Sequence, residues 1–344
     1  MKNKYVYEKA TVDDGAEIST LLKEYTLNNK IDFIYAKDNN AVKSLAHDSD
    51  ISLITVGRNI ETKKILGLGA ISVNNMFINN KQANVAYLST LRMKKGVFGH
   101  IKECYKILEN FCLENNVQYT YTTILKGNKK IQKMLTKKHK DVPQYIKYSD
   151  YTVKFFGKNY FSKTKFKLKK CENCEQLYNF IKDKNKNFSI RITYEMLKRG
   201  FFGLTYKDFY ILLDGNEILA CGVLWNQQKY KQMILKTNSI FYSFIRFIIN
   251  SFTALLGLPK FPKTDEIINY ATLSFVFYKD NYLKYFIKEL AYNLENYDFF
   301  VYGSKNKIPV HSFLKYESII YFVKWDNAEY TLPPNDIDLE CALL

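Results

Sequence analysis

Several residue types that mark particular classes of protein are scarce in this chain. Its 344 residues include 6 Cys, 6 Pro, 4 His and 2 Trp. The cysteines show no framework of the kind that disulfide-rich secreted domains use. Cys171 and Cys174 form a lone pair without a second pair at zinc spacing, and the four histidines are scattered. We therefore expect neither a bound metal nor a hydrolase triad.

The chain also lacks the apolar segments that would target it to a membrane. Its N-terminus, MKNKYVYEKATVDD, has no apolar core of the signal-peptide type. Residues 240–258 are apolar over nearly the length of a membrane span, but Arg246 and Asn250 lie in the middle, where charge is expensive. We expect this segment to be a buried or cleft-lining helix, no membrane contact, and a cytoplasmic location.

Positive charge is abundant but dispersed. With 51 Lys and Arg against 34 Asp and Glu, the formal net charge is +17. No run of five basic residues occurs, and the lysines alternate with acids, which is typical of a solvated surface. We do not expect nucleic acid as a partner. A basic nucleic-acid-binding protein, with 28 Tyr and 25 Phe for base stacking, stays as one alternative.

The most informative stretch is residues 85–135. Residues 85–93 predict a strand, 94–99 a glycine-containing turn, and 101–112 a helix with one apolar face. A second strand over 117–124 then leads to Asn128 and another helix. A loop with small residues that feeds a helix N-terminus can bind a pyrophosphate, because free backbone N–H groups and the helix dipole favour negative charge there.

This order of elements resembles the cofactor half of the GCN5-related N-acetyltransferase (GNAT) superfamily, and the context of residues 87–93 and Asn128 resembles a tandem two-domain bacterial branch. The resemblance implies that acetyl-CoA, or another acyl-CoA, binds where the strand before the loop separates from its neighbour. The cofactor contacts that it implies are Leu91, Arg92, Met93, Lys94, Lys95, Gly96, Val97, Phe98, Gly99 and Asn128. Asn128 can equally be a plain helix N-cap.

Acetyl transfer to an amine needs a base for the ammonium and an acid for the CoA thiolate. The family often places a tyrosine acid where this chain has Leu135. Tyr87 and Tyr121, on the two central strands, are the candidates to replace it, although either can also be a core residue. The base is not identified.

The same order of elements occurs again in the second half. A helix is expected over 174–184, strands over 208–213, 218–225 and 270–278, a helix over 281–294, and a strand over 299–302. At the position of the loop, the second half has Lys279, Asp280 and Asn281, none of which is a glycine. Their side chains would keep phosphate away from the backbone, and Asp280 would also repel it. We expect the cofactor only in the first half.

These observations predict four segments. Residues 1–155 form a GNAT-like domain that binds acyl-CoA, and residues 156–170 connect it to the second domain. Residues 171–328 form a degenerate GNAT-like domain, which is followed by a tail, residues 329–344. In the second domain, Trp225, Asn226 and Gln227 resemble a signature of the same tandem branch. They can line an acceptor pocket, or close a sheet edge against the other domain.

The predicted fold is therefore α/β with a mixed sheet, in which two tandem acyl-CoA N-acyltransferase (GNAT-like) domains form a pseudo-dimer. The predicted activity is transfer of an acetyl or other acyl group to a small-molecule or peptide amine by direct attack. A non-catalytic protein of this fold, for acyl-CoA sensing or protein binding, is the alternative. The chain is expected to be a monomer with an internal pseudo-dimer, or a homodimer.

Overall fold

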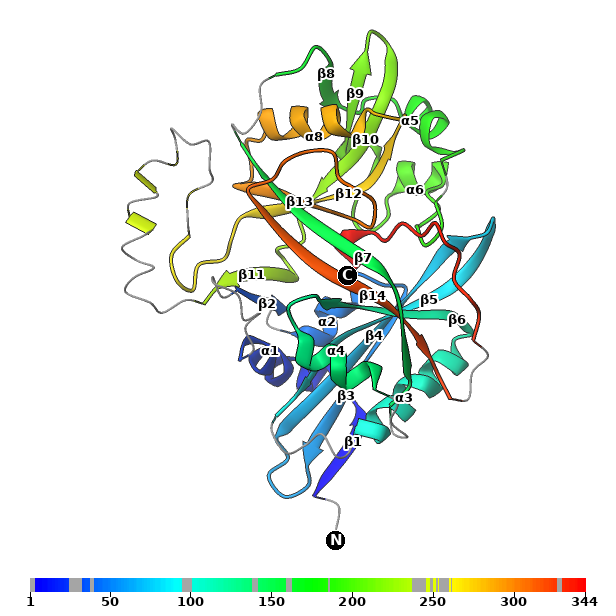
Figure 1. Cartoon of the computed structure of the whole chain (residues 1–344), viewed down its shortest axis with the longest axis vertical. Helices are drawn as coiled ribbons and strands as arrows, with labels where there is room; N and C mark the ends of the chain where they lie inside the picture. Colours follow the sequence, from blue (N-terminus) through cyan, green and yellow to red (C-terminus); the bar gives the residue numbers. More distant parts are fainter. Residues whose placement is uncertain are drawn as a thin grey trace.

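The structure is a computed structural model, shown in Figure 1. It describes residues 4–24, 33–37, 40–94, 101–137, 142–158, 163–184, 186–236, 246–247, 250–251, 253, 260, 262–326 and 330–344. Residues 95–99 of the predicted pyrophosphate loop, and most of the apolar segment 240–258, lie outside these ranges. In the described part, no helix combines the length and the apolar character needed to cross a membrane.

The described strands and helices follow the predicted order closely. The strands are β1 (Tyr5–Lys9), β2 (Phe33–Lys37), β3 (Ile51–Asn59), β4 (Ile65–Ile78), β5 (Lys81–Met93), β6 (Val117–Leu125), β7 (Gln144–Gly157), β8 (Lys167–Lys170), β9 (Phe209–Asp214), β10 (Glu217–Trp225), β11 (Lys231–Leu235), β12 (Tyr270–Tyr278), β13 (Phe299–Ser304) and β14 (Leu314–Lys324). The α-helices are α1 (Gly15–Lys23), α2 (Ala41–Ala46), α3 (Ile101–Glu114), α4 (Lys129–Thr136), α5 (Cys174–Ile181), α6 (Tyr194–Arg199) and α8 (Leu283–Tyr292). Within the expected connector 156–170, residues 167–170 form the edge strand β8.

One twelve-stranded sheet runs through both halves of the molecule, in the order β1-β3-β4-β5-β6-β14-β7-β13-β12-β10-β9-β8. Among the described strands of this sheet, β5–β6 and β12–β13 pair in parallel and the other neighbours are antiparallel. At the centre the halves exchange strands: β14, from the second half of the chain, lies between β6 and β7. Strand β7, from the first half, in turn pairs with β13. Figure 1 shows β7 and β14 crossing the middle of the molecule between the two halves.

Alternation along the strands sends side chains to two faces, and helices cover both. In the first half, Ile54 and Val56 pack with α1 and α2, whereas Ile71 and Val73 pack with α3. The second half repeats this arrangement, with α5 and α6 on one face and α8 on the other. The predicted repeat is thus confirmed as a repeat of layers as well as of element order.

The two halves also share a local irregularity. In β5 the register against β4 shifts, and Thr90 takes a left-handed conformation with φ 53°. In β12 the register against β10 shifts, and Phe275 has φ 52°. Aligning the strands at residues 85 and 270 puts Thr90 and Phe275 at the same position. A bulge bends a strand and ends its regular pairing, so each half has one built-in break in its sheet.

A smaller, two-stranded sheet also joins the halves. Strand β11 of the second half pairs antiparallel with β2 of the first. The C-terminal segment ends in a short 3₁₀ helix, η4 (Cys341–Leu343), which contacts β12 and β13. Figure 1 places the end of the chain at the centre of the molecule, between the two halves.

Candidate functional site

The predicted separation of strands is present in the first half. Pairing between β5 and β6 runs from Asn84 and Val117 to Tyr87 and Tyr121, and no described residue extends it. One step further, the Thr122 Oγ1 hydroxyl donates to the Leu88 carbonyl at 2.8 Å. A side chain therefore replaces the backbone ladder where the strands begin to part. Beyond this point the described residues of β5 and β6 are not paired with each other, and we call this region the gap.

The bulge at Thr90 lies in β5 just beyond its last pair with β6. The Lys94 amide donates to the Leu66 carbonyl of β4 at 2.8 Å. Because successive amides of a strand point to opposite sides, those of Met93 and Leu91 point away from β4, to the side of β6. Among the described residues no side chain accepts from them. These two amides are donors of the kind that a pantetheine arm could use.

Two tyrosines, Tyr87 and Tyr121, form the last pair of β5 and β6 before the gap. The rings of Tyr87 and Tyr121 lie 5.1 Å apart, and the Tyr87 hydroxyl lies 2.8 Å from Thr123 Oγ1. Burial raises the pKa of Tyr87 to about 12 and raises that of Tyr121 further. Both hydroxyls therefore keep their protons at neutral pH. Tyr121 is 1% exposed and belongs to the core cluster around Phe188 and Phe322, whereas Tyr87 is partly exposed.

The charged residues of the predicted cofactor site are placed only in part. Arg92 Nη1 donates to the Leu91 carbonyl at 2.9 Å, which holds its guanidinium beside the bulge. Lys94 Nζ lies 3.2 Å from Glu24 Oε2 at the surface. Residues Lys95, Gly96, Val97, Phe98 and Gly99 lie outside the described residues, so their predicted contacts stay predictions.

Asn128 caps helix α4. Its Oδ1 accepts from the Ile131 amide at 3.3 Å, which satisfies one of the free N–H groups at the helix start. Seven residues on, Leu135 is 5% exposed and packs in the core beside α3. The position where the family often has a tyrosine acid is thus a core position here. The proposed cofactor contact of Asn128 stays a prediction.

The equivalent gap in the second half holds a carboxylate of the chain itself. Pairing of β12 with β13 stops at Thr272 and Val301. The amide of Phe275, at the bulge, donates to Glu340 Oε2 at 2.7 Å. Glu340 Oε1 accepts from the Ala342 amide at 3.4 Å. In the second half, the amide at the bulge therefore has a partner within the chain, the Glu340 carboxylate.

The three residues of the predicted acceptor pocket have different surroundings. Trp225 is buried against Phe202 and Phe275, whereas Asn226 is exposed and its Oδ1 accepts from the Gln228 amide at 2.9 Å. Gln227 Nε2 donates at 3.1 Å both to Asp48 Oδ1 and to the Ala342 carbonyl.

The neighbouring Lys231 joins the same set of contacts. Its Nζ lies 2.8 Å from Asp48 Oδ2 and donates to the Ala342 carbonyl at 2.6 Å. Gln227 and Lys231 thus join the second half, the first half and the C-terminal segment. The assignment of Trp225, Asn226 and Gln227 to an acceptor pocket stays a prediction.

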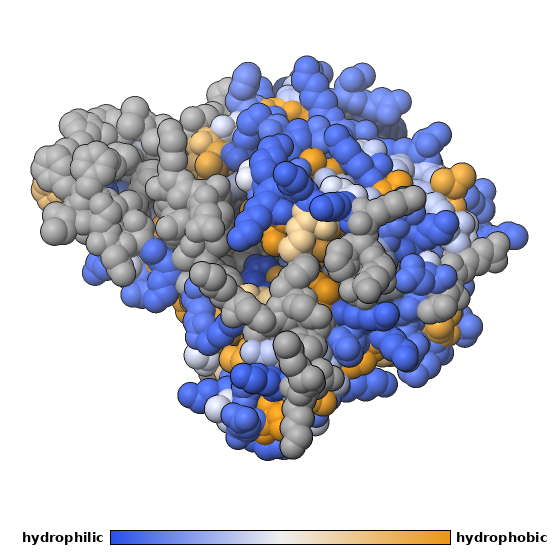
Figure 2. Space-filling model, turned by 60° about the horizontal axis from the view of Figure 1, so that its bottom comes forward, coloured by the Kyte–Doolittle hydropathy of each residue, from blue (hydrophilic) through white to orange (hydrophobic). Residues whose placement is uncertain are grey.

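No group of three or more His, Cys, Asp or Glu within the described ranges could hold a metal ion. Figure 2 shows a mostly hydrophilic face, on which the apolar residues form small separate groups. Some described surface lysines pair with acids, as Lys126 does with Asp150 at 2.7 Å and Lys315 with Glu317 at 3.2 Å.

No protein-family model and no curated protein matches this sequence, so the comparison rests on structure. Saccharomyces cerevisiae N-myristoyltransferase, solved with bound myristoyl-CoA, aligns over 98% of this chain and 83% of its own, with a TM-score of 0.54 and 13% identity. A GCN5-related glucosamine N-acetyltransferase region of a fungal multi-domain β-N-acetylglucosaminidase aligns over 92% of this chain and 38% of its own, with a TM-score of 0.57 and 10% identity.

The chain has the fold of the GNAT superfamily. It contains this fold as two tandem domains in a mixed α/β pseudo-dimer, as the resemblance in residues 85–135 predicted. In this GNAT fold, the two breaks at Thr90 and Phe275 occupy matched positions.

Sequence reasoning missed three residues of this central region: Asp48, Lys231 and Glu340. Asp48 and Lys231 meet across the two halves, so no local pattern signals them. Glu340 had one available signal, since a Glu followed by a short apolar end (Cys341–Leu344) is compatible with a buried C-terminal segment.

Proposed function

We propose that this chain is an acyl-CoA-dependent N-acyltransferase that holds its thioester in the first half. The observation that carries the proposal is the contrast between the two gaps. Alternation along β5 directs the amides of Leu91 and Met93 away from β4, whereas in the second half Glu340 accepts from the amide of Phe275, the counterpart of Thr90. Two structures that share the GNAT fold come from N-acyltransferases, one with bound myristoyl-CoA, which supports the same class of cofactor.

The proposed reaction is direct attack. The lone pair of an acceptor amine adds to the thioester carbonyl carbon, the C–S bond breaks, and the amine loses one proton while the CoA thiolate gains one. Tyr87 is the proposed acid, because it lies where the strands part and burial keeps its hydroxyl protonated. Tyr121 is the second candidate, placed deeper on the neighbouring strand.

The proposed acceptor is the amine of a small molecule or a peptide, and the proposed acyl donor is acetyl-CoA or a longer acyl-CoA. We also propose a cytoplasmic location, which agrees with six unpaired cysteines.

Calorimetric titration with CoA, acetyl-CoA, octanoyl-CoA and myristoyl-CoA tests the cofactor. We expect binding in the micromolar range, with the preferred acyl length revealed by the tightest complex. Thiol release across a panel of amines and N-terminal peptides then tests turnover. Absence of binding at about millimolar ligand would end the proposal of an acyl-CoA protein.

A non-catalytic acyl-CoA-binding protein is the second candidate, because the core residue Leu135 stands where the family often has its acid. Tight CoA binding without thiol release for any acceptor would favour it.

A further inference from the structure

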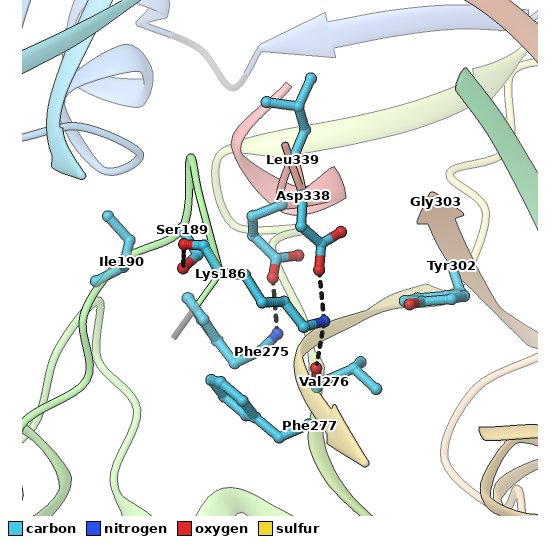
Figure 3. Close-up of a pocket in the computed structure, with 11 residues that line it drawn as sticks. Lys186, Ser189, Ile190, Phe275, Val276, Phe277, Tyr302, Gly303, Asp338 and Leu339 are labelled. Carbon is cyan, nitrogen blue, oxygen red and sulfur yellow. Dashed lines mark hydrogen bonds and ion pairs between the residues drawn. The ribbon is translucent and has the colours of Figure 1, made fainter. Parts of the chain in front are cut away.

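A small pocket lies in the second half, beside the gap between β12 and β13. It is lined by residues from four separate parts of the chain, chiefly Lys186, Phe275, Phe277, Tyr302, Asp338 and Glu340. Figure 3 shows Lys186 and Asp338 meeting over the carbonyl of Val276, with Tyr302 at the other side. The cavity is about 30 Å³. Since one water molecule needs about 10–15 Å³, the pocket suits a group of only a few heavy atoms.

The charges in this pocket are not balanced. Lys186 Nζ forms an ion pair with Asp338 and donates to the Val276 carbonyl at 3.2 Å. The single positive charge of the lining is thus matched by Asp338. Glu340 accepts from two backbone amides and from the Ser274 side chain, and no described cation is within ion-pair distance of it. With Glu340 ionised, the lining carries one excess negative charge.

An unpartnered hydroxyl faces the same space. Tyr302 is 6% exposed, and its hydroxyl makes no hydrogen bond with any described residue. In Figure 3 the oxygen of Tyr302 points into the pocket, towards the end of Lys186. Among the described residues only Tyr7 has a fully buried side-chain oxygen without a partner, so the Tyr302 oxygen is open to the pocket. A ligand in this pocket would supply a partner.

We infer that this pocket binds a primary ammonium group on a short apolar arm. The ammonium has three N–H donors, and the pocket offers it the Glu340 carboxylate, whose two oxygens have about four acceptor sites, and the Tyr302 oxygen. The rings of Phe275 and Phe277 provide apolar walls for the arm. The bound charge would balance the ionised Glu340.

The electrostatics of Glu340 support this assignment and make it sensitive to pH. Burial, reinforced by the nearby Asp338 carboxylate, raises the pKa of Glu340 to about 7. Five other titratable groups interact with Glu340 electrostatically. They are Lys186 in the loop after α5, Tyr121 in β6, Tyr151 in β7, Tyr302 in β13, and Cys341, which follows Glu340 in the chain. All but Lys186 oppose a negative charge when ionised. An ammonium ligand favours the ionised carboxylate, so its affinity should rise with pH.

Ethylammonium chloride is the probe, titrated into the ¹⁵N-labelled full chain without acyl-CoA. We expect the amide resonances of Phe275 and Gly303 to shift in a saturable way, while sodium chloride at equal ionic strength and ethanol leave them unchanged. The affinity should be roughly tenfold higher at about pH 8 than at about pH 6, because Glu340 is ionised at the former and protonated at the latter. No saturable shift, or no rise of affinity with pH, would overturn the inference.

Two conservative variants locate the effect. Tyr302→Phe removes only the hydroxyl and should weaken ethylammonium binding several-fold, while the pH dependence remains. Glu340→Gln keeps an acceptor for the Phe275 amide and should abolish the pH dependence. Glu172→Gln, an exposed carboxylate paired only with Lys169, is the matched control and should bind as the natural chain does. Equal affinity in Glu340→Gln and the natural chain would contradict the site. The inference does not depend on acyl transfer, because every readout is binding without a thioester.

Discussion

Lys231 Nζ lies 2.8 Å from Asp48 Oδ2, and both side chains are almost completely buried, 3% and 4% exposed. One residue belongs to the second half of the chain and the other to the first. The same lysine donates to the Ala342 carbonyl, and Gln227 donates to both Asp48 and Ala342. This network fixes the position of the C-terminal segment relative to both halves, beside the two gaps.

Removing one partner of this pair should be costly. Lys231→Met leaves the Asp48 carboxylate buried without its cation, and we expect the free energy of unfolding to fall by about 3–5 kcal/mol. Urea denaturation of the variant and the natural chain measures the difference. Lys169→Met, which breaks an exposed pair with Glu172, is the control and should change it by at most about 1 kcal/mol. A similar loss in both variants would show that burial of the pair is unimportant.

The proposed acid can be tested by deleting one oxygen. Tyr87→Phe should lower kcat of acyl transfer about 100-fold, with little change in the KM for acyl-CoA, since the ring still packs against Tyr121. Thiol-release kinetics provide both constants. Tyr119→Phe, two residues before Tyr121 on β6, serves as the control. If Tyr121→Phe loses kcat and Tyr87→Phe does not, the role passes to Tyr121.

Glu340 should make stability depend on pH in a defined direction. Its pKa in the folded chain, about 7, lies above the ordinary value of 4.5, so the folded state binds more protons than the unfolded state between these values. The contribution of Glu340 is therefore greatest below about pH 4.5, declines as the pH rises to about 7, and is then constant.

Comparison with Glu340→Gln isolates this contribution from those of other groups. The unfolding free energy of the natural chain minus that of the variant should fall by about 1–3 kcal/mol across this window. A difference that rises with pH would mean that the folded state stabilises the ionised form.

Gly303 should resist substitution for a steric reason. A Cβ at this position would lie 2.3 Å from the Tyr151 hydroxyl, which donates to the Leu339 carbonyl at 3.1 Å. Gly303→Ala should displace Tyr151 and destabilise the fold by about 1–3 kcal/mol. Thermal unfolding of Gly303→Ala is compared with that of Gly127→Ala, where an added methyl group would have no neighbouring atom within 4 Å. Equal destabilisation in the two variants would mean that Tyr151 can move aside without loss of stability.

Local patterns in the sequence were sufficient to predict most helices and strands and their repetition, because period and turn residues act over a few positions. The predicted strand over 270–278 agrees with β12 residue for residue. The exchange of β7 and β14 was not predictable in this way. Each strand has residues suited to either neighbour, and the choice of partner depends on packing between distant segments. Pairing of Asp48 with Lys231 has the same origin.

The sequence also predicted the candidate site only in part. The separation of β5 from β6 and the positions of Tyr87 and Tyr121 followed from the resemblance, which carries information on backbone shape. The carboxylate of Glu340 in the second gap did not, because a segment some 65 residues further along the chain supplies it.

Strand β14 has a consequence for how the protein is made. Residues 314–324 provide the neighbour of β6 in the folded chain, and they are synthesised long after β6, which ends at Leu125. While the ribosome is still adding residues before 314, the first half has an open strand edge at its centre, and such edges invite pairing with other chains. The nascent polypeptide is therefore exposed to aggregation until residues 314–324 have emerged, and protection by a chaperone would matter most during that interval.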